Sequence, residues 1–509
     1  MIATLYRSYL LEITVFVCGA LVMIFEIIGS RIVSPFIGTS TYVWTSLIGI
    51  ILGALSLGYW LGGRLADRRP DPKVLASVIL IAGGLIAFTV LIKDVALSSI
   101  ASARLGLEIK AVLASILLFG PASICLGIVT PFAVRLKMTS LDRTGSIVGR
   151  LYALSTIGSI TGTFAAGFFL IPFVGSVRTL YLIAGSLLIL ALLIAPVTFT
   201  TKNIAAGTLL LLGIAASEAG IYLLRQNSDL HDIDTEYSRV QVFNSLDPAT
   251  GRPIRALATD PYFVQSAAFI DSNELVLGYS RFYHLIRHFR PQFDKTLIIG
   301  GAGFSFPKEY LRVYPQARLD VVEIDPQMTR IARDFFGLRD DPRMTIFHED
   351  ARMYINRAET GQYDAVLMDA FGSLFSVPHH LTTIEAVREL SRILKDDGVV
   401  VFNLGSAITG PSNGFLQAEM RTYMEVFPQV LLFKVRPEYT DDRLQNLVIV
   451  ASKSAQQMIM TNDDPEIADL LSQQYNGVVA LENNILTDDL APVEYYNSIA
   501  QNIYLTSPR

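Results

Sequence analysis

The sequence is poor in cysteine and has no excess of positive charge, and these two shortages exclude several classes of protein. Only two cysteines occur in 509 residues, Cys18 and Cys125, and both lie inside apolar runs. A disulfide framework and a cysteine-based metal site are therefore excluded, and both side chains are expected to be small buried hydrophobic groups. The net charge of -5 and the isoelectric point near 5.8 predict no surface for nucleic acid.

Charge is sparse before Arg225 and dense after it, although 51% of all residues are hydrophobic and the mean hydropathy is +0.43. Such a chain is too apolar for one soluble globule and too long for one domain. We therefore expect an α-helical multi-span membrane bundle at residues 1–226, followed by structure of soluble composition.

The membrane spans are predicted from the length of the apolar runs, because a helix needs roughly 20 apolar residues to cross about 30 Å of hydrocarbon. Seven segments qualify, at about 10–30, 41–62, 74–93, 110–132, 149–172, 178–198 and 203–224. The first segment is not a signal peptide, since it carries Glu12 and Glu26 and more spans follow it. Small residues recur inside the spans, as in "GSITGTFAAG" (158–167), and predict close helix contacts in lipid.

Two loops rich in arginine and lysine, at 62–73 and about 135–150, predict the orientation of the bundle. Both loops and the amino terminus are expected to face the cytoplasm. Seven spans would then place the second half of the chain outside, away from cytosolic cofactor pools. Either one segment does not cross fully or the count is off by one, and 203–224, interrupted by Glu218, is the weakest span.

Three charged residues, Glu12, Glu26 and Arg31, lie in or beside the first span. A charge at the centre of a membrane helix costs roughly 2.5–3.5 kcal/mol on insertion scales, so such a group is a candidate for transport or for binding a lipid substrate. The competing interpretation is a structural pair, with Glu26 reaching Arg31.

The second half of the chain reads as two kinds of sheet. Residues 237–245 and 254–270 alternate apolar and polar residues and predict a small antiparallel sheet. Short apolar strands separated by helical patterns then follow and predict a parallel, doubly wound sheet, whose ligands bind at the carboxyl ends of the strands. These strands are "KTLIIG" (295–300), "ARLDVVEID" (317–325), "MTIFHED" (344–350), "YDAVLMD" (363–369) and "GVVVFNL" (398–404).

Acidic residues fall at successive strand ends of the predicted parallel sheet. Glu323 and Asp325 close the second strand, Asp350 the third and Asp369 the fourth, while Gly300, Gly301 and Gly303 follow the first. A carboxylate in this place can accept both hydroxyls of a ribose. Asp325 is also a good N-cap for a helix at 326–336, with Pro326 at its first position and Gly337 after its end.

The turn "GGAGFSFPKEY" (300–310) has Phe304, Phe306 and Pro307 where a pyrophosphate would need open backbone amides. A neutral adenosine suits the acids better than a phosphate does. The pattern is therefore that of an α/β class I S-adenosylmethionine-type (Rossmann-like) domain.

Residues ~235–450 resemble the spermidine synthase (polyamine aminopropyltransferase) family, and the whole chain resembles its membrane-fused branch. The resemblance is carried, in order, by "FVQSAAFIDSNELVLGYSRFYHL" (263–285), "LIIGGAG", "DVVEIDP", "HEDARMYI", "YDAVLMDAFGS" and "SVPHHLTT" (376–383). It implies a small β subdomain at 227–290, a catalytic domain at 291–452 and a closing segment at 453–509.

The resemblance also implies the roles of the site residues. Glu323 would bind the ribose hydroxyls, Asp350 with the adjacent Ala351 would bind the adenine, and Gln265 and Tyr279 would line the amine channel. Asp369 would accept a proton from the attacking amine, because an ammonium group is no nucleophile. The co-substrate would be decarboxylated S-adenosylmethionine or S-adenosylmethionine, with no cofactor bound permanently and no metal, because the sulfonium is already an activated leaving group. A small-molecule amine or other acceptor and the lipid bilayer are the expected partners, and a homodimer is one option.

Two departures from the family weaken the half of the site that would hold an amine. Where relatives with polyamine chemistry carry "GGGDGG", this chain has "GGAGFS", so Gly303 replaces an acid. The family's "D-S-[ST]-D" becomes "DAFG", so Gly372 replaces a second acid. Each lost charge-assisted hydrogen bond could be worth about 1.5–3 kcal/mol.

Three functions are therefore weighed: a membrane-tethered aminopropyltransferase acting on putrescine or a similar amine, a methyltransferase using intact S-adenosylmethionine, and a transporter or sensor whose module only binds the nucleoside. His284 is expected to pack or face solvent more readily than to touch substrate. The adjacent histidines of "VPHHL" (377–381) invite a metal interpretation, but neighbours in an extended loop point opposite ways, so a substrate lid is preferred.

Overall fold

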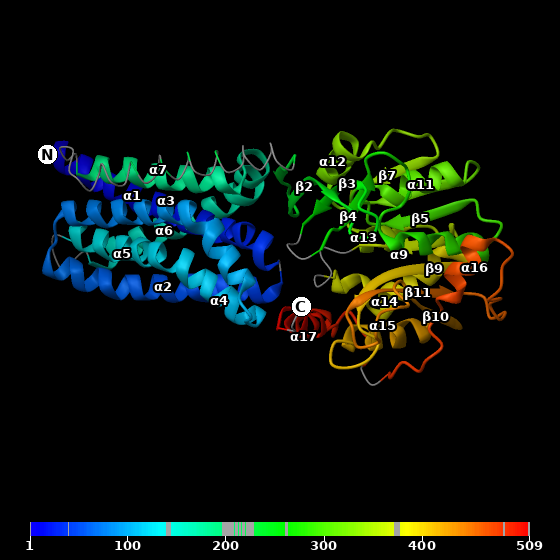
Figure 1. Cartoon of the computed structure of the whole chain (residues 1–509). Helices are drawn as coiled ribbons and strands as arrows, with labels where there is room; N and C mark the ends of the chain where they lie inside the picture. Colours follow the sequence, from blue (N-terminus) through cyan, green and yellow to red (C-terminus); the bar gives the residue numbers. More distant parts are fainter. Residues whose placement is uncertain are drawn as a thin grey trace. The chain divides into compact units, whose positions relative to one another are not determined.

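The structure of the chain is a computed structural model that describes residues 2–38, 40–138, 144–195, 229–259, 263–370, 377–481 and 484–506, with single residues between 208 and 219. It divides into two compact units, Met1–Arg239 and Val240–Arg509 (Figure 1). The predicted span at 203–224 and Gly372 lie outside the described residues.

The first unit is a bundle of long apolar helices, drawn from blue to green in Figure 1. Five described helices are long and apolar enough to cross a membrane, and the pair α4 and α5, bent by 53°, would add a sixth span. All six agree with predicted spans. Large apolar side chains such as Leu52, Phe169 and Ile189 are exposed on these helices, as a lipid-facing surface requires. The elements of the unit are α1 (Ile2–Ile37), α2 (Thr41–Arg68), α3 (Pro72–Ser102), α4 (Leu107–Leu118), α5 (Gly120–Lys137), α6 (Thr144–Ala165), the π-helix η2 (Ala166–Val174), α7 (Ser176–Ile194) and strand β1 (His231–Asp234).

The small residues of the spans bring helices into close contact, as predicted. A Cβ atom on Gly158 of α6 would clash with the carbonyl oxygen of Phe16 in α1. Only glycine allows this approach of the two backbones, which gives dispersion contacts where the hydrophobic effect between helices is absent.

Ion pairs hold the two predicted basic loops and the start of α1 together. Glu12 pairs with Lys137 and, at 2.8 Å, with Arg150, and Asp67 pairs with Arg135 at 3.2 Å. Asp67 therefore lies close to Arg135, and Lys137 and Arg150 lie close to Glu12, as the orientation prediction requires of the described parts of the two loops. Glu12 has a structural pair of its own, which favours the structural interpretation of this residue.

The proposed pair of Glu26 with Arg31 is wrong. Arg31 donates a hydrogen bond of 2.6 Å to the backbone oxygen of Glu236, and no ion pair between Arg31 and Glu26 occurs among the residues that the structure describes. Arg31 and Glu26 are five positions apart in α1, and side chains on one face of a helix are three or four positions apart.

The second unit begins with the predicted antiparallel sheet. Strands β2 (Arg239–Leu246), β3 (Pro253–Ala258) and β4 (Ser266–Phe269) pair in sequence order. The segment 254–270 forms two strands rather than one. Residues 278–289 then form three short helical turns, α9 (Gly278–Arg281), η3 (Phe282–Leu285) and α10 (Ile286–Phe289).

A seven-stranded sheet in the order β10-β11-β9-β8-β5-β6-β7 follows, and five of its strands are the predicted parallel ones. The prediction of a wholly parallel sheet is wrong at one edge, where β10 and β11 run antiparallel and no helix separates them. The strands are β5 (Lys295–Ile299), β6 (Arg318–Val322), β7 (Met344–Phe347), β8 (Tyr363–Met368), β9 (Leu394–Ser406), β10 (Gln429–Lys434) and β11 (Gln445–Ser452).

Helices cover both faces of this sheet. Successive residues of a strand point to opposite faces, so they meet different layers of helices. Leu297 and Ile299 join one buried cluster with helices α13, α14, α15 and α17, whereas Ile298 joins another with η3, α11, α12 and α16. The helices are α11 (Ser305–Val313), α12 (Pro326–Phe336), α13 (Ala351–Arg357), η4 (His379–Leu381), α14 (Ile384–Ile393), α15 (Gly414–Met424), α16 (Pro465–Ser472) and α17 (Val493–Thr506). The predicted doubly wound fold is confirmed.

Candidate active site

The glycine turn after β5 carries the first part of the site. Gly300 has a φ of 97°, and a Cβ atom there would clash with the carbonyl oxygen of Asp369. Glycine is therefore required where the ends of β5 and β8 come together. The backbone amides of Gly301 and Ala302 donate hydrogen bonds of 2.8 and 3.1 Å to Glu323 Oε2, so Glu323 holds the turn in shape.

Glu323 is almost fully buried, and burial raises the pKa of its carboxyl while three backbone amides oppose the rise. The third amide is that of Asp325, at 2.9 Å from Oε1. A carboxylate has about four lone-pair positions, so three amides leave room for one more donor. Asp325 accepts from the amide of Gln327 at 2.9 Å and caps α12, which confirms the predicted N-cap.

Asp369 follows β8 and is the centre of a hydrogen-bonded cluster. The Tyr279 hydroxyl donates to Oδ2 at 3.1 Å, and the Asn403 amide donates to Oδ1 at 3.1 Å. Tyr283 lies beside them, with its hydroxyl 3.5 Å from the oxygen of Met368. The cluster presents a carboxylate whose two oxygens are each oriented by a neutral donor.

The surroundings of Asp369 shift the pKa of its carboxyl toward neutral pH. Burial raises its pKa to about 7, and hydrogen bonds from Asn403, Tyr279 and Tyr283 limit this rise. Burial also raises the pKa of both tyrosines well above the usual value, so they stay neutral donors. A carboxyl with a pKa near the working pH is well matched to general base catalysis.

A cavity of about 370 Å³ opens onto Asp369. Tyr279, Asn403 and the turn at Gly301 line one part, and Gln265 lines it from the small sheet. Gln265 accepts a hydrogen bond of 2.8 Å from the Thr259 hydroxyl. Five of the predicted site residues therefore line one cavity: Asp369, Tyr279, Gln265, Gly300 and Gly301.

Asp350 lies at the start of α13 and is engaged on both oxygens. Oδ1 accepts from the amides of Arg352 and Met353 at 2.8 and 3.2 Å, and Oδ2 lies 3.1 Å from His380 Nε2. Ala351 is buried as the first residue of the helix. The roles of Asp350 and Ala351 toward an adenine stay predictions.

The histidines of "VPHHL" do not lie in an extended loop, which corrects the expectation. His379, His380 and Leu381 form the short 3-10 helix η4, and His380 turns toward Asp350. The local hydrogen bonds of Leu381 and Thr382 to Pro378 and His379 stabilise the turn.

Gly303 lies against Ser266 of the small sheet. A Cβ atom on Gly303 would lie 2.5 Å from Ser266 Oγ and 3.3 Å from the ring of Phe336. A side chain at position 303 would therefore require Ser266 to move.

His284 packs inside the protein, as expected. It is 3% exposed, its Nδ1 lies 2.6 Å from the Tyr314 hydroxyl, and its ring lies edge-on to Phe306. Burial lowers the pKa of His284 to about 4, so it is neutral at physiological pH.

Asn403 and Asn446 are site residues that sequence reasoning missed. Asn403 Oδ1 accepts a hydrogen bond of 3.0 Å from Asn446 Nδ2, and both side chains line the cavity with Asp369. A polar residue within the apolar run "GVVVFNL" was a signal for Asn403. Asn446 gave no signal, because its strand was not predicted.

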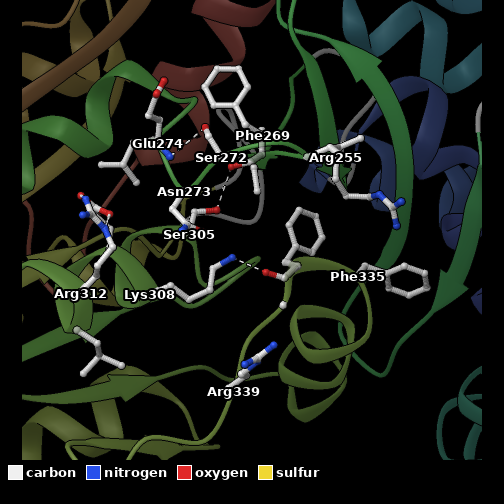
Figure 2. A pocket seen from close by; sticks show the side chains of 18 of the residues that line it. Arg255, Phe269, Ser272, Asn273, Glu274, Ser305, Lys308, Arg312, Phe335 and Arg339 are labelled. Carbon is white, nitrogen blue, oxygen red and sulfur yellow. Dashed lines mark hydrogen bonds and ion pairs between the residues drawn. The ribbon is translucent and has the colours of Figure 1, made fainter.

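A second, larger cavity of about 840 Å³ lies between the loop after β4, α11 and the end of α12 (Figure 2). Acidic and basic side chains both line it, and several neutralise one another, as Arg312 does with Glu309 at 2.5 Å. Lys308 donates to the backbone oxygen of Phe336 across the cavity. Asp369 does not line this cavity, so we assign the chemistry to the smaller one.

Comparison with known proteins finds a family model and relatives that resemble this chain. Residues 279–456 match the model described as the spermine/spermidine synthase domain. A polyamine aminopropyltransferase of Vibrio vulnificus is 27% identical over 287 residues, which cover 53% of this chain and 92% of that protein. Polyamine aminopropyltransferase 1 of Streptomyces coelicolor is 26% identical over 437 residues, which cover 79% of this chain and 77% of that protein. The latter match exceeds the length of the second unit and so includes part of the helical unit.

Solved structures show similar chains. A probable spermidine synthase from Corynebacterium glutamicum has a TM-score of 0.41 and 23% identity, covering 49% of this chain and 88% of that one. A spermidine synthase from Thermotoga maritima has a TM-score of 0.36 and 18% identity, covering 54% of this chain and 87% of that one.

Proposed function

We propose that this transferase moves an aminopropyl group from decarboxylated S-adenosylmethionine to a polyamine such as putrescine, because residues 279–456 match the spermine/spermidine synthase domain model and the relatives named above are polyamine aminopropyltransferases. The family is that of aminopropyl transfer, and the identity of the acceptor is our proposal.

One observation carries this proposal: Asp369 opens onto the cavity with its oxygens held by Tyr279 and Asn403. In the reaction, the amine nitrogen forms a bond to the aminopropyl carbon beside sulfur, and the carbon–sulfur bond breaks. The electron pair of that bond stays on sulfur, which becomes a neutral thioether. Asp369 accepts the proton that the amine loses, so the charges balance without a metal.

The nucleoside would lie over the strand ends that carry the other acids. Glu323 keeps the glycine turn in shape and has one lone-pair position left for a ribose hydroxyl. Asp350 Oδ2, which lies next to His380, would accept a hydrogen bond from the adenine amino group. Holding donor and amine in line would supply most of the acceleration.

A multi-pass protein of the cell membrane is supported by the five spanning helices and the bent pair. The basic residues Arg135 and Lys137 predict which end of the bundle faces the cytoplasm. Asp234 and Glu236, just before the second unit, bond to Ser176 and Arg31 and not to that basic end. A cytoplasmic catalytic unit is therefore proposed because its co-substrate is expected in cytosolic pools. A reporter fused after Leu224 tests the side on which the second unit lies. A periplasmic or extracellular signal would contradict the proposed location.

A methyltransferase that uses intact S-adenosylmethionine is the second candidate. It is favoured by Gly303, because the acid that would pair with the aminopropyl ammonium, and repel a methionine carboxylate, is absent there, and a side chain at this position would require Ser266 to move. The two candidates differ in the donor, so the donor decides between them.

The test supplies the full-length chain, in detergent or lipid nanodiscs, with putrescine and either donor. Mass spectrometry of the acceptor is expected to show one aminopropyl addition from the decarboxylated donor and no methyl addition from the intact one. The exposed carboxylate variant Asp396→Asn is the matched control and should retain activity. Methylation with the intact donor alone would favour the second candidate, and no transfer to any amine would overturn the proposal.

A further inference from the structure

A chain of two side-chain amides runs from the far side of the cavity to the proposed base. Asn446 Nδ2 donates to Asn403 Oδ1 at 3.0 Å, and Asn403 Nδ2 donates to Asp369 Oδ1 at 3.1 Å. The three residues come from β11, β9 and the end of β8, which are neighbours in the sheet. Asn446 is paired in register with Gly405, which has no side chain to block the path to Asn403.

The direction of these two hydrogen bonds matters because an asparagine amide has a donor end and an acceptor end. Asn403 is 4% exposed and uses its oxygen to accept from Asn446, so its nitrogen faces Asp369. The reversed amide would set its oxygen against the carboxylate of Asp369, and two acceptors would then face each other. The Asp369 carboxylate and the Asn446 amide therefore favour the same orientation of Asn403, and Asn446 adds the contact that holds the oxygen end.

We propose that Asn446 is a positioning residue that acts through Asn403 to keep Asp369 ionised and oriented for the incoming amine. This inference rests on the proposed function for the role of Asp369 as a base. With Oδ1 held by Asn403, the other oxygen, Oδ2, is shared between Tyr279 and the substrate amine.

The other groups near Asp369 do not depend on Asn446. Tyr279 and Tyr283 face the carboxyl from α9 and η3, and Asp247 and Arg436 are the remaining charged residues that line the same cavity in the described part of the chain. Hydrogen bonding from Asn403 lowers the pKa of Asp369 against the effect of burial. Loss of the oriented amide should therefore raise that pKa.

The test compares Asn446→Leu, Asn403→Leu and the double variant in the full-length protein. Asn446→Leu should move the acid limb of the pH dependence of kcat upward by about one pH unit, which corresponds to one charge-assisted hydrogen bond, and leave KM for the donor within about twofold. Because Asn446 acts through Asn403, the double variant should match Asn403→Leu alone. Gln445→Leu, on the same strand but bonded to the loop oxygens of Thr440 and Arg443, controls for damage to β11.

A second readout does not need turnover. The carboxyl infrared band that wild type has and Asp369→Asn lacks reports the ionisation of Asp369, and its midpoint should rise in Asn446→Leu by the same amount. Absence of aminopropyl transfer in wild type would overturn the proposed function but not the amide chain, if the midpoint still moves. An unmoved midpoint and acid limb, or effects of the two single variants that add in the double variant, would overturn the inference.

Discussion

The pH dependence of turnover tests the assignment of Asp369 most directly. Burial raises the pKa of Asp369 from 3.8 to about 7, and only the ionised form can accept a proton. At saturating substrates, kcat should therefore rise through about pH 7. With this midpoint, Asp369 is ionised in roughly a tenth of the protein molecules at pH 6 and in about nine tenths at pH 8. The value of kcat should therefore increase about tenfold between these pH values.

The variant Asp369→Asn keeps the size of the side chain and removes the base. Loss of a positioned general base typically costs 10²–10⁴-fold in rate, so kcat should fall by roughly that factor while affinity for the donor changes by only a few fold. The residual activity should also lose the acid limb near pH 7.

The assay is initial-rate formation of the thioether nucleoside by liquid chromatography, from pH 5.5 to 8.5. Saturating amine keeps ionisation of the free substrate out of kcat. Asp396→Asn serves as the control, because its carboxylate is fully exposed. A flat kcat between pH 6 and 8, or an Asp369→Asn variant within tenfold of wild type, would refute the reasoning.

Three further predictions follow from other contacts of the second unit. Tyr279→Phe removes the 3.1 Å hydrogen bond to Asp369, so kcat should fall about tenfold and its acid limb should move to higher pH; an unchanged pH profile would contradict this contact. Gly303→Asp should lower the melting temperature because its Cβ would lie 2.5 Å from Ser266 Oγ, and adding Ser266→Gly should restore much of the stability, as thermal unfolding followed by fluorescence can show. Glu419→Met should stabilise the protein by about 1–3 kcal/mol, because both carboxylate oxygens of Glu419 are buried and neither has a hydrogen-bond partner among the residues that the structure describes. Burial raises the pKa of Glu419 well above 4.5, so the unfolded chain releases this proton at a lower pH than the folded protein does. The stability of the wild type therefore falls as pH rises above 4.5, and the gain from Glu419→Met should be larger at pH 8 than at pH 5.

The order of the parallel strands and the ends at which the acids gather could be predicted from the sequence. Four of the parallel strands are short apolar runs with an acid or a glycine at or just beyond the end, at Gly300, Glu323, Asp350 and Asp369. Carboxyl ends of parallel strands meet at one edge, so these residues had to converge. Asp325 was predictable as a cap for the same reason, because capping depends only on residues next to it in the chain.

The antiparallel edge of the sheet was not predictable in this way. Strands β10 and β11 carry apolar residues but no helix lies between them, and whether such runs pair antiparallel depends on the strand they meet. Asn446 entered the site only through that pairing, so its contact with Asn403 could not be foreseen.

The sequence by itself determined the two halves of the protein, the spans of the helical half and the acids of the site, because hydrophobic periodicity and strand length are local properties. Only the tertiary structure decided what those acids touch: Glu323 holds the glycine turn, Asp350 meets His380, and Asp369 is oriented by Tyr279 and Asn403. These partners lie 21 to 90 positions apart in the chain, and a hydrogen bond between them depends on distances that the packing of the sheet and its helices sets.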